Sequence, residues 1–165
     1  MKTTKKELII IVTIAIIALS GFLIFRSVFK TPSKNPAIVQ HWYANSTGFN
    51  VTEDLVLIDF DKKKVTILNK QSGVPSEYGS YPQINLENNT VTVLGEYVEP
   101  KSKKRQELVV EYDFINRTVE IIEETSPKGI CSNMGKQVKF PLICLPNQMK
   151  VIFDIAKDDG IDYEQ

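Results

Sequence analysis

The sequence is poor in the residues that carry most enzyme chemistry. Its 165 residues include one histidine, His41, and two cysteines, Cys131 and Cys144. A single histidine severely restricts both metal ligation and acid–base catalysis. The HExxH, GxSxG, P-loop and GxGxxG patterns are also missing from the sequence. We therefore expect a protein that is not an enzyme, with no catalytic residues, no metal site and no cofactor.

Neither sign of charge predominates. Twenty lysines and arginines balance twenty aspartates and glutamates, so the formal net charge is zero. Nucleic-acid binding needs clustered basic side chains, and we therefore expect no nucleic-acid partner. The one dense basic cluster is Pro100–Gln106 (PKSKKRQ). A solvated hairpin tip explains it, and contact with anionic lipid head groups is the alternative.

One stretch, Leu8–Phe25, contains no charged residue at all. As a helix with a rise of about 1.5 Å per residue, it would be roughly 27 Å long, close to the thickness of a bilayer's hydrocarbon core. Lys5, Lys6 and Arg26 flank it and can reach the two membrane interfaces. The stretch therefore predicts an uncleaved transmembrane signal-anchor.

Two alternatives compete with an anchor. A cleaved signal peptide could use the small residues of Ala18–Ser20, but the apolar run continues beyond that point to Phe25. A buried helix of a soluble protein would need polar residues that Leu8–Phe25 lacks. The prediction is therefore an anchor, with the membrane as a partner.

Basic residues are nearly balanced on the two sides of this span, so the positive-inside rule does not decide the orientation. Because only seven residues precede the span, we expect it to export the remainder of the chain. The predicted protein is a single-pass cell-membrane protein with an extracytoplasmic C-terminal domain. Its parts are a cytoplasmic tail and anchor (1–30), a spacer (31–36), a β domain (37–157) and an acidic tail (158–165).

Beyond the spacer the pattern is typical of β-strands. Short runs rich in Val, Ile, Tyr and Phe alternate with Asn, Asp, Gly, Pro and Lys clusters, without a sustained helical period. This predicts a mostly β domain, a small antiparallel barrel or sandwich. Pro141 predicts an edge strand or a bulge in the last hairpin. The expected hairpins are 55–68, 83–94, 109–122 and the pair of strands 138–145 and 149–155.

Two of these hairpins resemble each other. Leu55–Leu68 aligns with Val109–Ile122, and Asp59 matches Asp113. We interpret them as two hairpins with the same tight four-residue connection; a duplication is the alternative. Each aspartate precedes its turn, where Asp commonly accepts backbone hydrogen bonds. Paired catalytic carboxylates are the other interpretation of these two residues.

The cysteines and one aromatic cluster are the candidate site residues. Twelve residues separate Cys131 from Cys144, which is too far for a CxxC pair, and no companion Cys or His is present for zinc. We predict a structural disulfide that contributes about 3 kcal/mol, with two free thiols as the alternative. His41, Trp42 and Tyr43 are a candidate contact for a partner, or a strand histidine packed beside aromatic residues.

The segment Ser126–Ile155 (SPKGICSNMGKQVKFPLICLPNQMKVIFDI) resembles the NusG domain II family of bacterial membrane-anchored proteins. The similarity covers about 50 residues and is clearest over 109–157. It implies a short anchor followed by a small β domain, and it brings no catalytic residues. Ser126 stands where many members have another cysteine, which weakens a redox or metal cluster. The residues that carry the pattern are Pro127, Cys131, Gly135, Cys144, Leu145, Pro146 and Asn147.

Together these features predict a membrane-anchored, extracytoplasmic binding or scaffold module for a membrane or cell-surface protein. The alternative comes from the resemblance alone: family members occur beside membrane flavin-transfer and quinone functions. It implies an accessory component of an extracytoplasmic electron-transfer system that uses Cys131 and Cys144.

Overall fold

The computed structural model of the chain describes residues 5–30, 35–44, 48 and 50–153. For residues 7–10, 24–30 and 50 only the backbone is described. The chain separates into two compact units, residues 1–31 and residues 32–165. Most of the predicted spacer and all of the predicted acidic tail lie outside the described residues.

The first unit is one helix, α1 (Lys5–Lys30), which covers the predicted anchor. Its described apolar side chains are exposed on every side of the helix. The hydroxyl of Ser20 donates to the carbonyl of Ile17 at 2.9 Å, so this polar group is satisfied within the helix. Among the described residues, no helix combines the length and apolar character that crossing a membrane requires. The predicted span includes residues 8–10 and 24–25, whose side chains lie outside the description.

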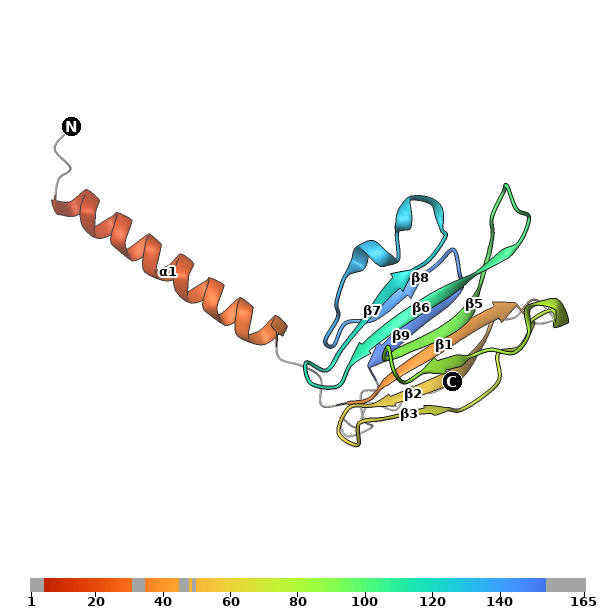
Figure 1. The fold of residues 1–165 in the computed structure, drawn as a ribbon. Helices are drawn as coiled ribbons and strands as arrows, with labels where there is room; N and C mark the ends of the chain where they lie inside the picture. Colours follow the sequence, from red (N-terminus) through yellow and green to blue (C-terminus); the bar gives the residue numbers. More distant parts are fainter. Residues whose placement is uncertain (1–4, 31–34, 45–47, 49, 154–165) are drawn as a thin grey trace. The chain divides into compact units, whose positions relative to one another are not determined.

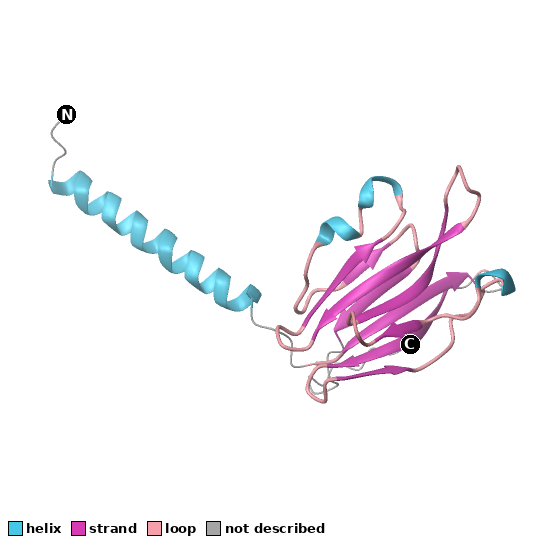
Figure 2. Cartoon of the chain, in the orientation of Figure 1, coloured by secondary structure: helices cyan, strands magenta, loops and turns pink. Residues whose placement is uncertain are grey.

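The second unit is built from two antiparallel sheets (Figures 1 and 2). A five-stranded sheet has the order β3-β2-β1-β9-β8, and a four-stranded sheet has the order β4-β5-β6-β7. Its described helical turns are short 3-10 segments. The strands are β1 (Ala37–Ala44), β2 (Asn50–Asp59), β3 (Lys64–Ile67), β4 (Gln83–Asn85), β5 (Thr90–Val98), β6 (Arg105–Asp113), β7 (Thr118–Glu123), β8 (Leu142–Cys144) and β9 (Met149–Phe153).

The core lies between the two sheets and confirms the predicted sandwich. Side chains alternate between the faces of a strand, so every second residue points inward. From the five-stranded sheet, Val39, Val56 and Val151 occupy paired positions on β1, β2 and β9 and are buried. Val110 and Tyr112 contribute the opposing wall from β6. Burial raises the pKa of the Tyr112 hydroxyl.

Four of the hairpins in these sheets use a connection of four residues. The connections are residues 60–63, 86–89, 114–117 and 145–148. In each, the last residue adopts a positive φ, which lets the chain reverse within the short loop. These residues are Lys63, Asn89, Arg117 and Gln148, with φ of 48°, 54°, 54° and 50°.

Three of the four connections are held by the residue before the loop. Asp59 Oδ1 accepts the backbone N–H of Lys62 at 2.9 Å. In the same way, Asn85 Oδ1 accepts the backbone N–H of Asn88 at 3.1 Å, and Asp113 Oδ1 accepts that of Asn116 at 3.0 Å. These bonds confirm a structural role for both predicted aspartates. The Lys62 N–H is the main cause that lowers the pKa of Asp59. For Asp113 the main cause is the Asn116 side-chain amide, which donates to Oδ2 at 2.6 Å and lowers the pKa of that carboxyl.

The fourth hairpin differs from the prediction in its first strand. The sequence predicts a strand over 138–145, but β8 begins at Leu142. Pro141 has no N–H to donate, and Gln137 instead pairs with Val119 on β7 through two backbone bonds. The chain therefore leaves the edge of one sheet and enters the other between these residues. β8 is the edge strand of its sheet, as Pro141 predicted.

Candidate functional site

The Cys131–Cys144 disulfide lies at this crossing. Its Cα atoms are 5.2 Å apart, and both cysteines are fully buried. Cys131 precedes a 3-10 turn in the loop after β7, and Cys144 ends β8. The bond therefore ties a loop that leaves one sheet to an edge strand of the other. The predicted pairing is present.

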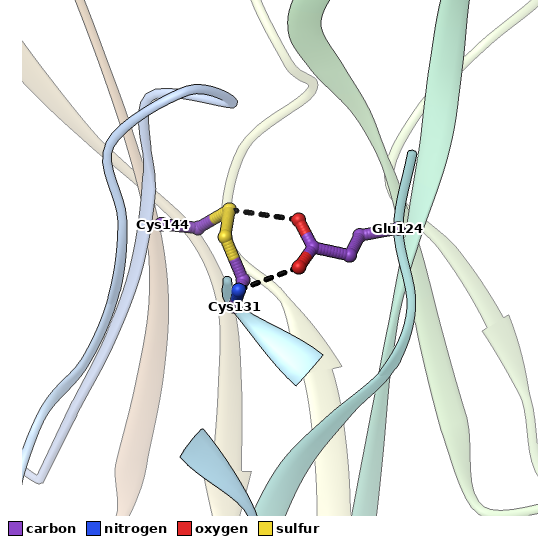
Figure 3. A group of neighbouring side chains, drawn as sticks. All are labelled: Glu124, Cys131 and Cys144. Carbon is purple, nitrogen blue, oxygen red and sulfur yellow. Dashed lines mark hydrogen bonds between the residues drawn. A yellow bond between two sulfur atoms is a disulfide. The ribbon is translucent and has the colours of Figure 1, made fainter. Parts of the chain in front are cut away.

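Glu124 faces the disulfide, as Figure 3 shows. Its Oε1 accepts the backbone N–H groups of Cys131 at 2.5 Å and Ser132 at 3.0 Å. Its Oε2 accepts the hydroxyl of Ser126 and lies 3.6 Å from Cys144 Sγ. A disulfide sulfur carries no proton, so this last approach is a contact with no hydrogen bond. Three donors thus orient the carboxylate toward the sulfur atoms.

Asn147 connects the disulfide to the other sheet. It is 2% exposed, and its amide nitrogen donates to Cys144 Sγ at 3.3 Å. Its side-chain oxygen accepts the N–H of Tyr97, and its carbonyl accepts that of Glu96, both at 3.3 Å. Gly95 makes this approach feasible, because an added Cβ there would lie 2.1 Å from Asn147 Oδ1. The β8–β9 turn is therefore fastened to β5.

A part-buried cluster of polar and charged side chains lies beside this junction. His41 Nε2 on β1 is 3.1 Å from Glu96 Oε1, and the Arg105 guanidinium is 2.5 Å from the same oxygen. Arg105 also donates to the carbonyls of Gly95 and Gly73 at 2.7 and 2.8 Å. His41 is fully buried, and within the described part of the chain its Nδ1 has no hydrogen-bond partner. The cluster joins β1 to β5 and β6.

A hollow of about 560 Å³ opens next to Glu124. Glu107, Glu123 and Glu124 line it, together with Tyr81 and Arg105. The Tyr81 hydroxyl donates to Glu107. Burial, and secondarily this bond, raises the pKa of Tyr81 to about 12. The lining has more carboxylates than basic groups, and its arginine is already paired with Glu96. Its charge therefore favours a cation.

The predicted contact residues differ in burial. His41 is buried and stacks on Tyr43, with ring centroids 5.5 Å apart, while Trp42 and Tyr43 are half-buried. A binding role for Trp42 and Tyr43 stays a prediction. Of the family pattern, Gly135 has a φ of 63° and ends a 3-10 turn, and Asn147 is the buried bridge. Pro127 and Leu145 are exposed, and Pro146 lies within the last connection.

Sequence reasoning missed Glu124, Glu96 and Arg105. Glu124 lies seven residues before Cys131 in an acidic, threonine-containing run, with no spacing that marks it as a ligand. The sequence places Arg105 within the basic loop, yet its guanidinium turns inward to four acceptors. No local pattern indicates contacts between strands that are distant in the chain. No family model, curated protein or solved structure matches this chain.

Proposed function

We propose that this protein is a membrane-anchored binding module, with α1 in the lipid and the β sandwich outside the membrane. The observation that supports it is the distribution of exposed apolar side chains on α1. At 100° per residue, Ile11, Ile14, Ile16 and Ile17 point in different directions, and all are more than half exposed. A helix that is apolar all round requires burial in protein or lipid.

The anchor is tested by membrane fractionation of cells that express the full chain. The wild type is expected to stay in the membrane pellet after an alkaline wash. Changing Ile14 and Ile17 together to Lys places two charges in the span and should release the chain, because each costs about 2.5–3.5 kcal/mol at the centre. The matched control changes both to Leu and should stay in the pellet. Release of the wild type would refute the anchor.

The topology is tested by adding protease to intact cells. The sandwich is expected to be digested or shaved from the cell surface, while a cytoplasmic marker protein stays intact. If the sandwich survives on intact cells and is digested after lysis, the extracytoplasmic placement is refuted.

The edge strand β8 is our candidate contact surface for a membrane or cell-surface protein. β8 pairs with β9 on one side and forms the edge of its sheet, and an edge of this kind can accept a strand from a partner. Ile143 is 44% exposed, and Leu145, directly after β8, is 71% exposed. The binding role therefore predicts that this edge, with its apolar residues, carries the contact.

Cross-linking and affinity purification from membranes in mild detergent test this surface. Leu145→Asp is expected to reduce the co-purified partner by about tenfold or more, the loss that a desolvated apolar contact of about 1.4 kcal/mol implies. Leu86→Asp is the matched control, because Leu86 holds the same place in the β4–β5 connection and is equally exposed at 71%. Recovery of the chain alone, or equal loss in both variants, contradicts the proposal.

A second candidate function is favoured by the Glu124 carboxylate beside the disulfide: an accessory role in extracytoplasmic electron transfer. A carboxylate 3.6 Å from Cys144 Sγ can take up or return the thiol proton when the bond opens or closes. Trapping of thiols in cells tests it. The fraction of reduced pairs should follow the electron supply of the cell, and a pair that stays fully oxidised refutes this role.

A further inference from the structure

Three donor groups of the kinds that bind zinc meet at the disulfide. The ligand atoms of Glu124, Cys131 and Cys144 all lie within 4.8 Å of one another. Around a tetrahedral Zn²⁺, with bonds of about 2.0–2.3 Å, ligand atoms lie roughly 3.3–3.8 Å apart. Glu124 Oε2 is already 3.6 Å from Cys144 Sγ, so the main change is that the two sulfur atoms, bonded in the disulfide, would have to separate. Such movements fall within side-chain adjustment of one loop and one edge strand.

The carboxylate keeps its orientation independently of the sulfur atoms. Its oxygens accept from the N–H groups of Cys131 and Ser132 and from the Ser126 hydroxyl. Asn147 donates to Cys144 Sγ from the other side, an arrangement that stabilises a thiolate better than a neutral sulfur. Reduction therefore places two thiols beside a carboxylate that is already in position.

The hollow beside Glu124 supplies access. Glu124 and Ser132 belong to its lining, while both cysteines are buried behind them. Glu107 and Glu123 line the same hollow and attract a cation toward it. A metal ion that arrives from this side meets Glu124 first and keeps one coordination position toward water.

We propose that, once the disulfide is reduced, Cys131, Cys144 and Glu124 bind one Zn²⁺ with a fourth position open to the hollow. The inference rests on the second candidate function in one respect, because the disulfide must open. An external dithiol donates two electrons and two protons to the Cys131–Cys144 disulfide. The S–S bond breaks into two thiols, and the external dithiol is oxidised to its own disulfide. Zn²⁺ then displaces the two thiol protons to solvent.

The test uses the full chain in detergent, reduced with a phosphine, which supplies the same two electrons without offering a thiol ligand. Zinc is measured by elemental mass spectrometry, and Co²⁺ is used as a spectroscopic substitute. The reduced chain is expected to hold one metal per molecule, with a thiolate-to-cobalt charge-transfer band. The reoxidised chain should hold none.

Glu124→Gln tests the carboxylate. Glutamine keeps an oxygen that accepts the Cys131 and Ser132 N–H groups but is a poorer zinc ligand. We expect affinity to fall by at least the roughly 10- to 100-fold that losing a hydrogen-bond partner of a metal ligand costs. Glu120→Gln is the matched control, because Glu120 lies on the preceding strand β7 and outside the lining of the hollow, and it should bind as the wild type does. Trp42 fluorescence verifies that each reduced variant remains folded.

The contrary results are distinct. A reduced, folded chain that binds no metal overturns the zinc site and leaves the electron-transfer role standing. A disulfide that opens only on unfolding overturns both. Equal binding by oxidised and reduced chains, or by Glu124→Gln and Glu120→Gln, places any bound metal elsewhere and overturns the proposed site.

Discussion

The four hairpins with four-residue connections make the same turn, but the β8–β9 hairpin is held by a different interaction from the other three. In the first three, Asp59, Asn85 or Asp113 accepts the N–H of the third loop residue. In the β8–β9 hairpin, Cys144 takes that position, and its sulfur accepts the side chain of Asn147 instead. All four end with a residue at positive φ. The loop geometry is shared, whereas the interaction that holds it is not.

The difference separates local from tertiary stabilisation. An Asx residue closes its turn with atoms three residues away, so the turn can form within an isolated hairpin. The β8–β9 turn depends on the disulfide, on Gly95 and on the N–H groups of β5, all contributed by other parts of the chain. We therefore expect perturbations of the fourth hairpin to act on the whole sandwich, and those of the first three to act locally.

The largest effect should follow loss of the disulfide. Replacing both Cys131 and Cys144 by Ser is expected to lower the free energy of unfolding by about 3 kcal/mol, since the bridge closes a loop with a separation of 13 residues. Urea unfolding of the full chain in detergent, followed by fluorescence of the single tryptophan, Trp42, measures it. An unchanged urea midpoint would show that the disulfide of the β8–β9 hairpin does not stabilise the sandwich.

Next, Asn147→Ala should cost about 2 kcal/mol, because it removes a buried side chain that bridges two sheets and leaves the part-buried N–H of Tyr97 without its acceptor. Asn88→Ala is the matched control. Asn88 is also the third residue of its connection, but its side chain is exposed, and only its backbone N–H bonds to Asn85. The same unfolding measurement should show a change within about 0.5 kcal/mol. Equal losses would contradict the comparison.

Gly95→Ala should cost about 1–2 kcal/mol, because its Cβ would overlap Asn147 Oδ1. The overlap disappears when Asn147 is also replaced by Ala. The cost of Gly95→Ala should therefore be smaller in the Asn147→Ala background, and a double-mutant cycle measures this coupling. Strict additivity would show that Gly95 matters for another reason.

A smaller, pH-dependent effect should come from the two aspartates. Because folding lowers the pKa of Asp59 and Asp113, each contributes stability above its unfolded pKa of about 3.9 and loses it as the pH falls through the folded value. Asp113→Asn should therefore flatten the decline of stability below about pH 4. Unfolding curves at several pH values measure it, and an unchanged slope would exclude Asp113 as a source.

The smallest effect is expected at the residues with positive φ. Lys63→Gly and Gln148→Gly should each change the free energy of unfolding by less than about 1 kcal/mol, because relief of backbone strain offsets the added freedom of the unfolded chain. Similar values for the two would confirm that the first and the fourth connection share this conformation. A large difference between the two free-energy changes would show that the first and fourth hairpins differ in backbone strain as well as in side-chain interactions.

Much of this fold was predictable because its determinants are close in the chain. Alternating apolar residues located the strands, and aspartates before loops located two turns and their bonds. The disulfide was predictable because the chain has two cysteines to pair. Strand order, the crossing at Pro141 and the site residues Glu124, Glu96 and Arg105 were not, since their contacts join segments whose proximity no local pattern encodes.

By itself, the sequence determined an early apolar helix, a β domain with four tight hairpins, and the pairing of its cysteines. Each comes from periodicity, turn chemistry or count, properties of neighbouring residues. Only the tertiary structure decided that His41 is buried against Glu96 and that Glu124 faces the disulfide. Those arrangements depend on two sheets packing face to face, and the energy of that packing is a property of the whole chain.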